Sequence, residues 1–265
     1  MPPCPPDLVA FAHDLGDLAC DLLRRYARGT VTVETKGDGS PVTEVDRTVE
    51  TALREAIRRA HPSHGVIGEE FGADRPDAEF VWILDPLDGT REFIQGLPLF
   101  GTLIALAHDE KIVLGLAEQP LSRDRFVGAE GYGSSWNGTP ISVRPCAALA
   151  DAMLSTTGYD SFAAHRYNVL RPLRGACRGV VNGDTWMVFG LIAAGRVDAV
   201  ASDGFYLHDY AALDAIVRNA GGVVTDWAGQ RLTLASDRSI VAAGDARLHA
   251  ALLAALAPAR DADAR

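Results

Sequence analysis

Residues 80–90 read Phe-Val-Trp-Ile-Leu-Asp-Pro-Leu-Asp-Gly-Thr, an apolar run that ends in two aspartates. The β-branched and aromatic residues of this run predict a buried strand. Pro86 has no backbone N–H group, so we expect the chain to leave the sheet there, and Gly89 permits a tight turn. Two carboxylates this close repel each other unless a cation lies between them, and oxygen ligands suit Mg²⁺ or Mn²⁺. An Asx turn at the strand end would explain the same residues without a metal.

Further acidic residues lie on both sides of this run. Asp46 follows a Gly-rich polar segment at residues 36–43, and Glu69 follows a short apolar run. Asp209 precedes an apolar segment that predicts a helix. Each acid alone has a structural explanation, since Asp is common at helix N-caps and Glu in solvated turns. If they converge, they form a carboxylate cluster of the kind that holds two or more divalent ions.

Composition narrows the possible partners. The chain has 265 residues, enough for one large domain or two compact ones, and 48% of them are hydrophobic. Its net charge of −10 argues against binding nucleic acid or an anionic membrane. Four scattered cysteines form no Cys-x-x-Cys pair, which indicates reduced thiols in a cytoplasmic protein. We find no run of membrane-spanning length and no signal-peptide pattern at the N-terminus.

The remaining pattern predicts an α+β half at residues 1–143 and an α/β half at residues 144–265. In the first half, short spacing between strands favours antiparallel pairing. We expect helices over 7–28 and 43–60, and strands over 30–35, 66–68, 80–85, 100–107, 112–118, 125–129 and 141–143. In the second half we expect strands over 152–156, 197–200, 223–226 and 240–244, with helices over 161–171, 184–195, 210–220 and up to 256, followed by a frayed tail.

The Asp-Pro-Leu-Asp-Gly-Thr block at 85–90 and the segment from Asp209 to Asp226 resemble the two signatures of the inositol monophosphatase superfamily. They occur in the family's order, and the resemblance covers nearly the whole chain. These proteins are metal-dependent, lithium-sensitive phosphatases. The resemblance implies a layered αβαβα sandwich of α+β and α/β halves, an active site between the halves, and a homodimer.

The resemblance also implies a centre for two or three Mg²⁺ ions, which Mn²⁺ can replace. Glu69, Asp85 and the backbone carbonyl of Leu87 would hold the first ion. Asp85, Asp88 and Asp209 would hold the second. A weaker third ion would be ordered by two residues of a mobile loop, Lys36 and Asp38.

Catalytic roles follow from the same resemblance. Glu69 and Thr90 would position the attacking water, and Asp46 would accept a hydrogen bond from the Thr90 hydroxyl. The amides of Gly89 and Thr90 would bind the phosphate group of a small phosphate monoester. No Gly-x-Ser-x-Gly, His-Glu-x-x-His or Walker motif offers a competing chemistry.

Several segments resemble the histidinol-phosphatase branch of the superfamily: residues 97–106, 118–120 and 183–184, and the pair Asp209-Tyr210. Histidinol phosphate carries an ammonium and an imidazole, which acidic side chains would attract. The candidate substrate contacts are therefore three acids and one histidine next to a metal ligand: Asp184, Asp203, Glu92 and His208.

Two features depart from that branch. Its members carry an acid seven residues before the metal-binding aspartate, where this chain has Ser202. In addition, residues 90–93 are closer to the adenosine bisphosphate phosphatases. We therefore rank histidinol-phosphate phosphatase first, with inositol-1-monophosphatase and adenosine 3',5'-bisphosphate phosphatase as alternatives. A non-catalytic binding protein of the same fold would have lost a ligand, and all the implied ligands are present.

Overall fold

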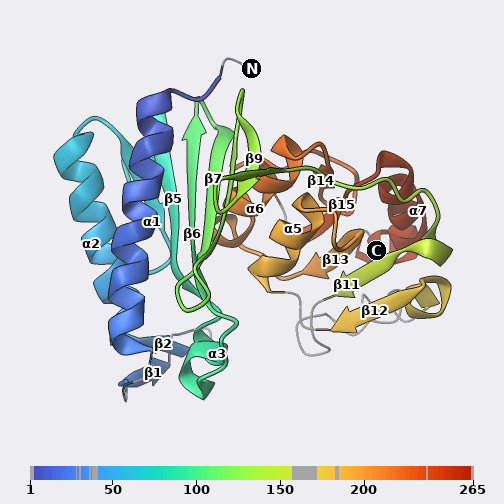
Figure 1. Cartoon of the computed structure of the whole chain (residues 1–265), viewed down its shortest axis with the longest axis horizontal. Coiled ribbons are helices and arrows are strands. Elements are labelled where there is room, and N and C mark those ends of the chain that lie inside the picture. Colours follow the sequence, from blue (N-terminus) through green and yellow to red (C-terminus); the bar gives the residue numbers. More distant parts are fainter. Residues whose placement is uncertain are drawn as a thin grey trace.

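The computed structural model describes residues 3–27, 29, 31–35, 37, 41–156, 172–182, 185–236 and 238–263. Lys36, Asp38 and Asp184 lie outside the described residues, as does the helix predicted over 161–171. Among the described residues, the elements stack as helices, sheet, helices, sheet and helix (Figure 1). This arrangement confirms the predicted αβαβα sandwich.

In the described part of the chain, eight strands form the first sheet, in the order β10-β9-β8-β7-β6-β5-β3-β4. All neighbours are antiparallel except β3 and β5, which are parallel. Turns with positive φ at Asp109-Glu110 and Asn137-Gly138 close two of its hairpins. The strands are β3 (Gly65–Gly68), β4 (Gly72–Asp74), β5 (Phe80–Asp88), β6 (Gly101–His108), β7 (Lys111–Gln119), β8 (Asp124–Ala129), β9 (Gly133–Trp136) and β10 (Thr139–Ile141).

Two amphipathic helices, α1 (Pro6–Tyr26) and α2 (Glu44–Ala60), cover the outer face of this sheet (Figure 1). Their apolar faces pack on β5, β6 and β7 and form one of the three hydrophobic clusters of the described residues. Thr43 caps α2, and its side chain accepts a hydrogen bond from the Val45 amide. Before α2, the strands β1 (Val33–Thr35) and β2 (Pro41–Thr43) form a small antiparallel pair.

The second sheet is mixed, with the order β12-β11-β13-β15-β14. Strand β11 is parallel to β12 and β13, whereas β15 is antiparallel to β13 and β14. The strands are β11 (Met153–Thr156), β12 (Gly179–Asn182), β13 (Ala199–Asp203), β14 (Val223–Thr225) and β15 (Ser239–Ala243). Further helices of the described residues include α3 (Thr90–Gln95), the 3₁₀ turn η1 (Leu149–Asp151), α5 (Trp186–Ala193), α6 (Leu207–Asn219) and α7 (Ala246–Asp263).

Helices α5 and α6 lie between the two sheets (Figure 1). Helix α6 contacts strands of both, and every residue from Tyr210 to Val217 is buried. Helix α6 therefore packs against both sheets at once. The division of the chain at residues 143 and 144 into two halves stays a prediction.

Among the predicted boundaries that differ from the structure, three have a clear physical reason. The chain does not leave the sheet at Pro86: β5 continues to Asp88, and the register shifts between Asp85 and Asp88. Proline fits there because a bulge already interrupts the hydrogen-bond ladder. Strand β10 ends at Ile141, because the Val143 amide bonds to the carbonyl of Ala220 instead of to a strand.

The third correction concerns the C-terminal tail. Helix α7 passes through Pro258 and ends at Asp263, instead of ending near residue 256. Leu248, Leu252 and Leu256 recur every four residues on its buried face and pack on the second sheet. That packing carries the helix to the end of the described residues.

Candidate metal centre

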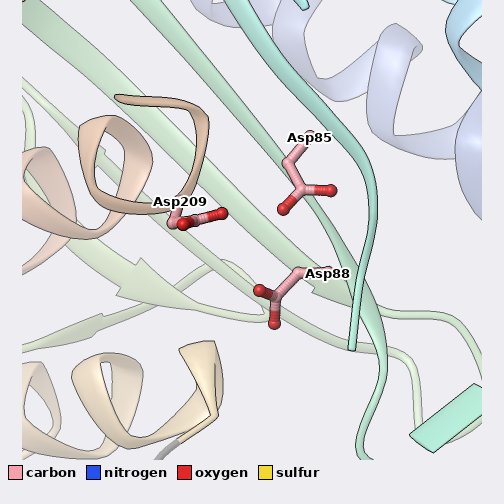
Figure 2. Close-up of side chains that lie close together, drawn as sticks. All are labelled: Asp85, Asp88 and Asp209. Atoms are coloured by element: carbon pink, nitrogen blue, oxygen red, sulfur yellow. The ribbon is translucent and has the colours of Figure 1, made fainter. Parts of the chain in front are cut away.

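Asp85 and Asp88 come from the end of β5. Residues three positions apart on a regular strand point to opposite faces. The bulge between them adds a residue to one side, so both carboxylates face the same space (Figure 2). The Leu87 amide donates a 3.0 Å hydrogen bond to Asp85 Oδ1, which fixes that side chain. Gly89, with a φ of 81°, then turns the chain into α3.

Asp209 comes from the first turn of α6. Its Oδ2 accepts a 2.6 Å hydrogen bond from the amide of Tyr206, the residue that caps the helix. This reciprocal cap holds the carboxylate at the helix start, where it points toward β5 (Figure 2). One carboxylate oxygen each from Asp85, Asp88 and Asp209 lies within 4.8 Å of the other two.

The trio concentrates negative charge in a buried part of the molecule. Burial raises the pKa of Asp85 well above its usual value, and the charges of Glu69, Asp88 and Asp209 raise it further. Burial also raises the pKa of Asp88, with Asp209 and Glu69 as the next causes. A divalent ion would remove this repulsion, and three converging carboxylates are the hard oxygen donors that Mg²⁺ and Mn²⁺ prefer. The residues present therefore fit the implied metal.

Glu69 lies in a turn that a buried carboxylate holds in place. Glu50, fully buried on α2, accepts a 2.7 Å hydrogen bond from the Glu70 amide. A Cβ at Gly68 would lie 2.0 Å from Glu50 Oε1, so only glycine allows this approach. Glu69 lines the same cleft as Asp88 and Asp209. Its charge raises the pKa of Asp85, but its carboxylate is outside the close trio.

Thr90 and Asp46 are joined by a hydrogen bond. The Thr90 hydroxyl lies 3.1 Å from Asp46 Oδ1 and 3.1 Å from the Leu87 carbonyl oxygen, and it donates to either. Asp46 is buried and also accepts a 2.8 Å hydrogen bond from the Thr43 amide. Burial raises the pKa of Asp46, and its hydrogen bonds from Thr43 and Thr90 only partly oppose this.

An open cleft of about 560 Å³ is lined by two of the three aspartates, Asp88 and Asp209. It brings together seven of the residues predicted for the site: Glu69, Asp88, Gly89, Thr90, Glu92, His208 and Asp209. Asp203 does not line it. Its carboxylate, at the end of β13, accepts a 2.9 Å hydrogen bond from the Gly204 amide.

Several residues that line this cleft were not predicted from the sequence, among them Arg91, Trp186 and Tyr206. The Trp186 amide, at the start of α5, opposes the rise in the pKa of Asp88. Its indole Nε1 is buried and finds no partner in the part of the chain that the structure describes. The sequence predicted this helix from residue 210, whereas α6 begins at Leu207, and this error hid Tyr206 as the residue that caps it.

Over the described ranges, no helix combines the length and the apolar character needed to span a membrane.

Comparisons with known proteins all point to the same protein family. A family model described as the inositol monophosphatase family matches residues 6–261. The chain is 36% identical over 257 residues to the chloroplastic bifunctional phosphatase IMPL2 of Arabidopsis thaliana, covering 94% of this chain and 74% of that protein. It is 35% identical over 231 residues to the histidinol-phosphatase of Mycobacterium tuberculosis, covering 84% of this chain and 88% of the relative.

Solved structures agree with this result. An inositol monophosphatase from Zymomonas mobilis matches with a TM-score of 0.87 and 40% sequence identity, over 94% of this chain and 97% of that one. The fold, the length of the match and the acidic centre all point the same way. The chain belongs to the inositol monophosphatase family and is a phosphomonoesterase.

Proposed function

We propose that the chain hydrolyses histidinol phosphate at a Mg²⁺ centre built on Asp85, Asp88 and Asp209. The observation that carries the proposal is the convergence of these three carboxylates, within 4.8 Å, at the cleft that Asp88 and Asp209 line. Two of them come from β5 and one from α6, so the cluster exists only in the folded protein.

The ligands would divide between two ions. Asp85 would contribute to both, with Glu69 and the Leu87 carbonyl completing the first and Asp88 and Asp209 the second. A third ion, near Lys36 and Asp38, belongs to the same proposal, as does replacement of Mg²⁺ by Mn²⁺. When bound, such ions neutralise charge on a phosphate ester and favour ionisation of water.

The protein's own groups would orient the reactants. Thr90 and Glu69 face the cleft, where they can hold a water molecule for attack on phosphorus. Asp46 can take the Thr90 hydroxyl proton into a hydrogen bond, which turns the lone pairs of that oxygen toward the water. The amides of Gly89 and Thr90, at the start of α3, would donate to the phosphate oxygens.

Substrate choice is proposed from the cleft and the relatives together. Histidinol phosphate brings an ammonium and an imidazole, and Glu92 lines the cleft close to Gly89. A relative named histidinol-phosphatase is 35% identical to this chain. His208, Asp203 and Asp184 remain proposed contacts of the same substrate. A cytoplasmic homodimer inhibited by lithium completes the proposal.

Two observations favour the alternatives. The solved structure described above, 40% identical to this chain, is named an inositol monophosphatase. Arg91 also lines the cleft and offers a cation for a second anionic group, as in adenosine 3',5'-bisphosphate. These substrates differ in charge away from the reacting phosphate, so one residue can separate them.

Phosphate release from the three substrates, with Mg²⁺ and with excess chelator, tests the proposal. We expect the highest kcat/KM for histidinol phosphate and no turnover with chelator. Glu92→Gln should lower kcat/KM for histidinol phosphate roughly tenfold and leave kcat/KM for inositol 1-phosphate unchanged. Arg91→Gln is the matched control and should affect only the bisphosphate. If either alternative substrate were hydrolysed faster, it would replace histidinol phosphate as the proposed substrate. Full activity in chelator would refute the metal centre.

A further inference from the structure

The segment that leads into the metal ligand Asp209 is held by a single arginine outside the cleft lining. Strand β13 ends at Asp203, which pairs with Ser239 at the start of β15. This register places Arg238 directly beside the connection from β13 to α6. The connection contains Gly204, Phe205 and Tyr206, and Gly204 adopts a φ of 95°.

Both the main chain and the side chain of Arg238 make hydrogen bonds to this connection. Its carbonyl oxygen accepts hydrogen bonds from the Gly204 amide at 2.8 Å and the Phe205 amide at 3.0 Å. Its guanidinium Nη2 donates a 2.8 Å hydrogen bond back to the Gly204 carbonyl. The same guanidinium covers the ring of Tyr206, with Cζ 3.9 Å from the ring centroid.

Tyr206 is in turn hydrogen-bonded to Asp209. The Tyr206 amide donates to Asp209 Oδ2 at 2.6 Å, and the Asp209 amide donates to the Tyr206 carbonyl at 3.1 Å. The Tyr206 ring also stacks on His208, at 5.5 Å between centroids and 16° between planes. Tyr206 is 44% exposed, and its ring contacts among the described residues are the stacked His208 and the Arg238 guanidinium. The Arg238 side chain is therefore a main constraint on its position.

We propose that Arg238 is a positioning residue for the metal centre: through Tyr206 it sets the orientation of the Asp209 carboxylate and thereby the affinity for divalent cations. The inference rests on the metal centre of the proposed function. It assigns a role to a residue that is neither one of the trio nor part of the cleft lining. Groups that orient metal ligands in this way typically change affinity without being ligands themselves.

Binding of Mn²⁺ without substrate, measured by electron paramagnetic resonance of the free ion, tests the inference. Arg238→Ala should weaken Mn²⁺ binding about tenfold. Arg238→Lys keeps a cation and one donor for the Gly204 carbonyl, so it should recover part of that loss. Arg196→Ala is the matched control, since Arg196 covers the Trp136 ring at 4.8 Å but lines a separate pocket. It should bind Mn²⁺ as the unmodified protein does.

A second variant keeps the test decisive if Arg238→Ala folds poorly. Tyr206→Ala retains both arginine and backbone cap but removes the covered ring, and should give a similar loss. The double variant should lose no more than the larger single loss, because both act along one route. Unchanged affinity in Arg238→Ala, or additive losses in the double variant, would overturn the inference.

Asp209→Asn separates this inference from the proposed function. It should weaken Mn²⁺ binding more than Arg238→Ala does, and normal affinity in that variant would refute the centre and the role of Arg238 together. Failure to hydrolyse histidinol phosphate would refute only the substrate, since Mn²⁺ binding is measured in its absence.

Discussion

At the scale of single residues, the metal centre is an electrostatic compromise. Asp85 is 1% exposed, yet it faces the charges of Asp88 and Asp209 across a few ångströms. The protein tolerates this because the Leu87 amide donates to Asp85 and the Tyr206 amide donates to Asp209. Without a cation these donors offset only part of the repulsion, so each aspartate should cost the empty protein stability while serving the loaded one.

Asp88→Asn should therefore separate activity from stability. The variant loses a carboxylate ligand, so kcat/KM should fall more than about 100-fold. Because burial and the neighbouring acids raise the pKa of Asp88, its ionised form destabilises the fold at pH 7, and Asn should raise the Tm in chelator by about 2–4 °C. Calorimetry and phosphate release measure both. A lower Tm in chelator, or retained turnover, would contradict this explanation.

Thr90 offers a second test at this scale. Thr90→Val keeps the shape but removes the hydroxyl that bonds to Asp46 and the Leu87 carbonyl. We expect kcat to fall about 100-fold with little change in Mn²⁺ affinity, because the hydroxyl orients water and is not one of the proposed ligands. Thr90→Ser retains the hydroxyl and should keep most of the activity. Full activity in Thr90→Val together with a loss in Thr90→Ser would show that the methyl group, not the hydroxyl, matters.

At the scale of elements, a column of rings joins the turn between α2 and β3 to the start of β5. His61 and His64 stack at 4.6 Å, and His64 stacks on Phe80 at 5.1 Å. The Trp82 indole donates a 3.1 Å hydrogen bond to His64 Nδ1, so that nitrogen must carry no proton. Burial lowers the pKa of His64, and the neighbouring His61 lowers it further.

This column makes stability depend on pH. The folded pKa of His64 lies below its unfolded value, which is about 6.5. Its contribution is therefore complete above that pH and is lost as the pH falls through and below it. His64→Gln, whose amide oxygen can also accept from Trp82, should flatten the decline in Tm between about pH 7 and pH 5. An unchanged slope would show that other groups cause the decline.

The sequence predicted correctly those helices and strands whose position depends on neighbouring residues in the chain. Thr43 and Asp46 form a capping box that starts α2 at the expected place, and the apolar run at 80–84 forms the centre of the first sheet. Prediction from the sequence failed where pairing with a distant strand determines the structure. Pro86 stays in its strand because β6 pairs again with β5 at Asp88, after the bulge, and nothing local signals that pairing.

The candidate site was predicted to a similar extent. The family resemblance identified the acids, and the structure brings Asp85, Asp88 and Asp209 together. It could not identify Arg238, which is 29 residues from Asp209 in sequence and meets it only through a strand register and an aromatic ring.

At the scale of the whole molecule, α6 connects the metal centre to both sheets. Its backbone lies directly on two glycines of the first sheet. A Cβ at Gly115 would lie 2.1 Å from the Ala212 carbonyl oxygen, and one at Gly128 would lie 2.6 Å from that of Ala215. Such contacts depend on a helix almost 100 residues away in sequence, so the sequence alone gives no sign of them. The position of Asp209 relative to β5 depends on this close approach.

Gly115→Ala should consequently affect stability and metal binding together. The added methyl must push α6 away from the sheet, at a cost of about 1–3 kcal/mol. Because α6 carries Asp209, Mn²⁺ affinity should fall as well. Gly175→Ala is the control, since no atom lies within 4 Å of the added Cβ. Chemical denaturation and Mn²⁺ titration measure the two effects. Normal stability in Gly115→Ala would show that the contact between helix and sheet yields easily.

The most direct measurement is the anomalous diffraction of crystals grown with Mn²⁺. The proposal predicts a peak between Asp85, Asp88 and Asp209, with carboxylate oxygens about 2.0–2.3 Å from the ion. The peak should weaken or vanish in Asp209→Asn. Crystals that contain Mn²⁺ elsewhere, with no density among these three side chains, would contradict the central claim that they form one metal centre.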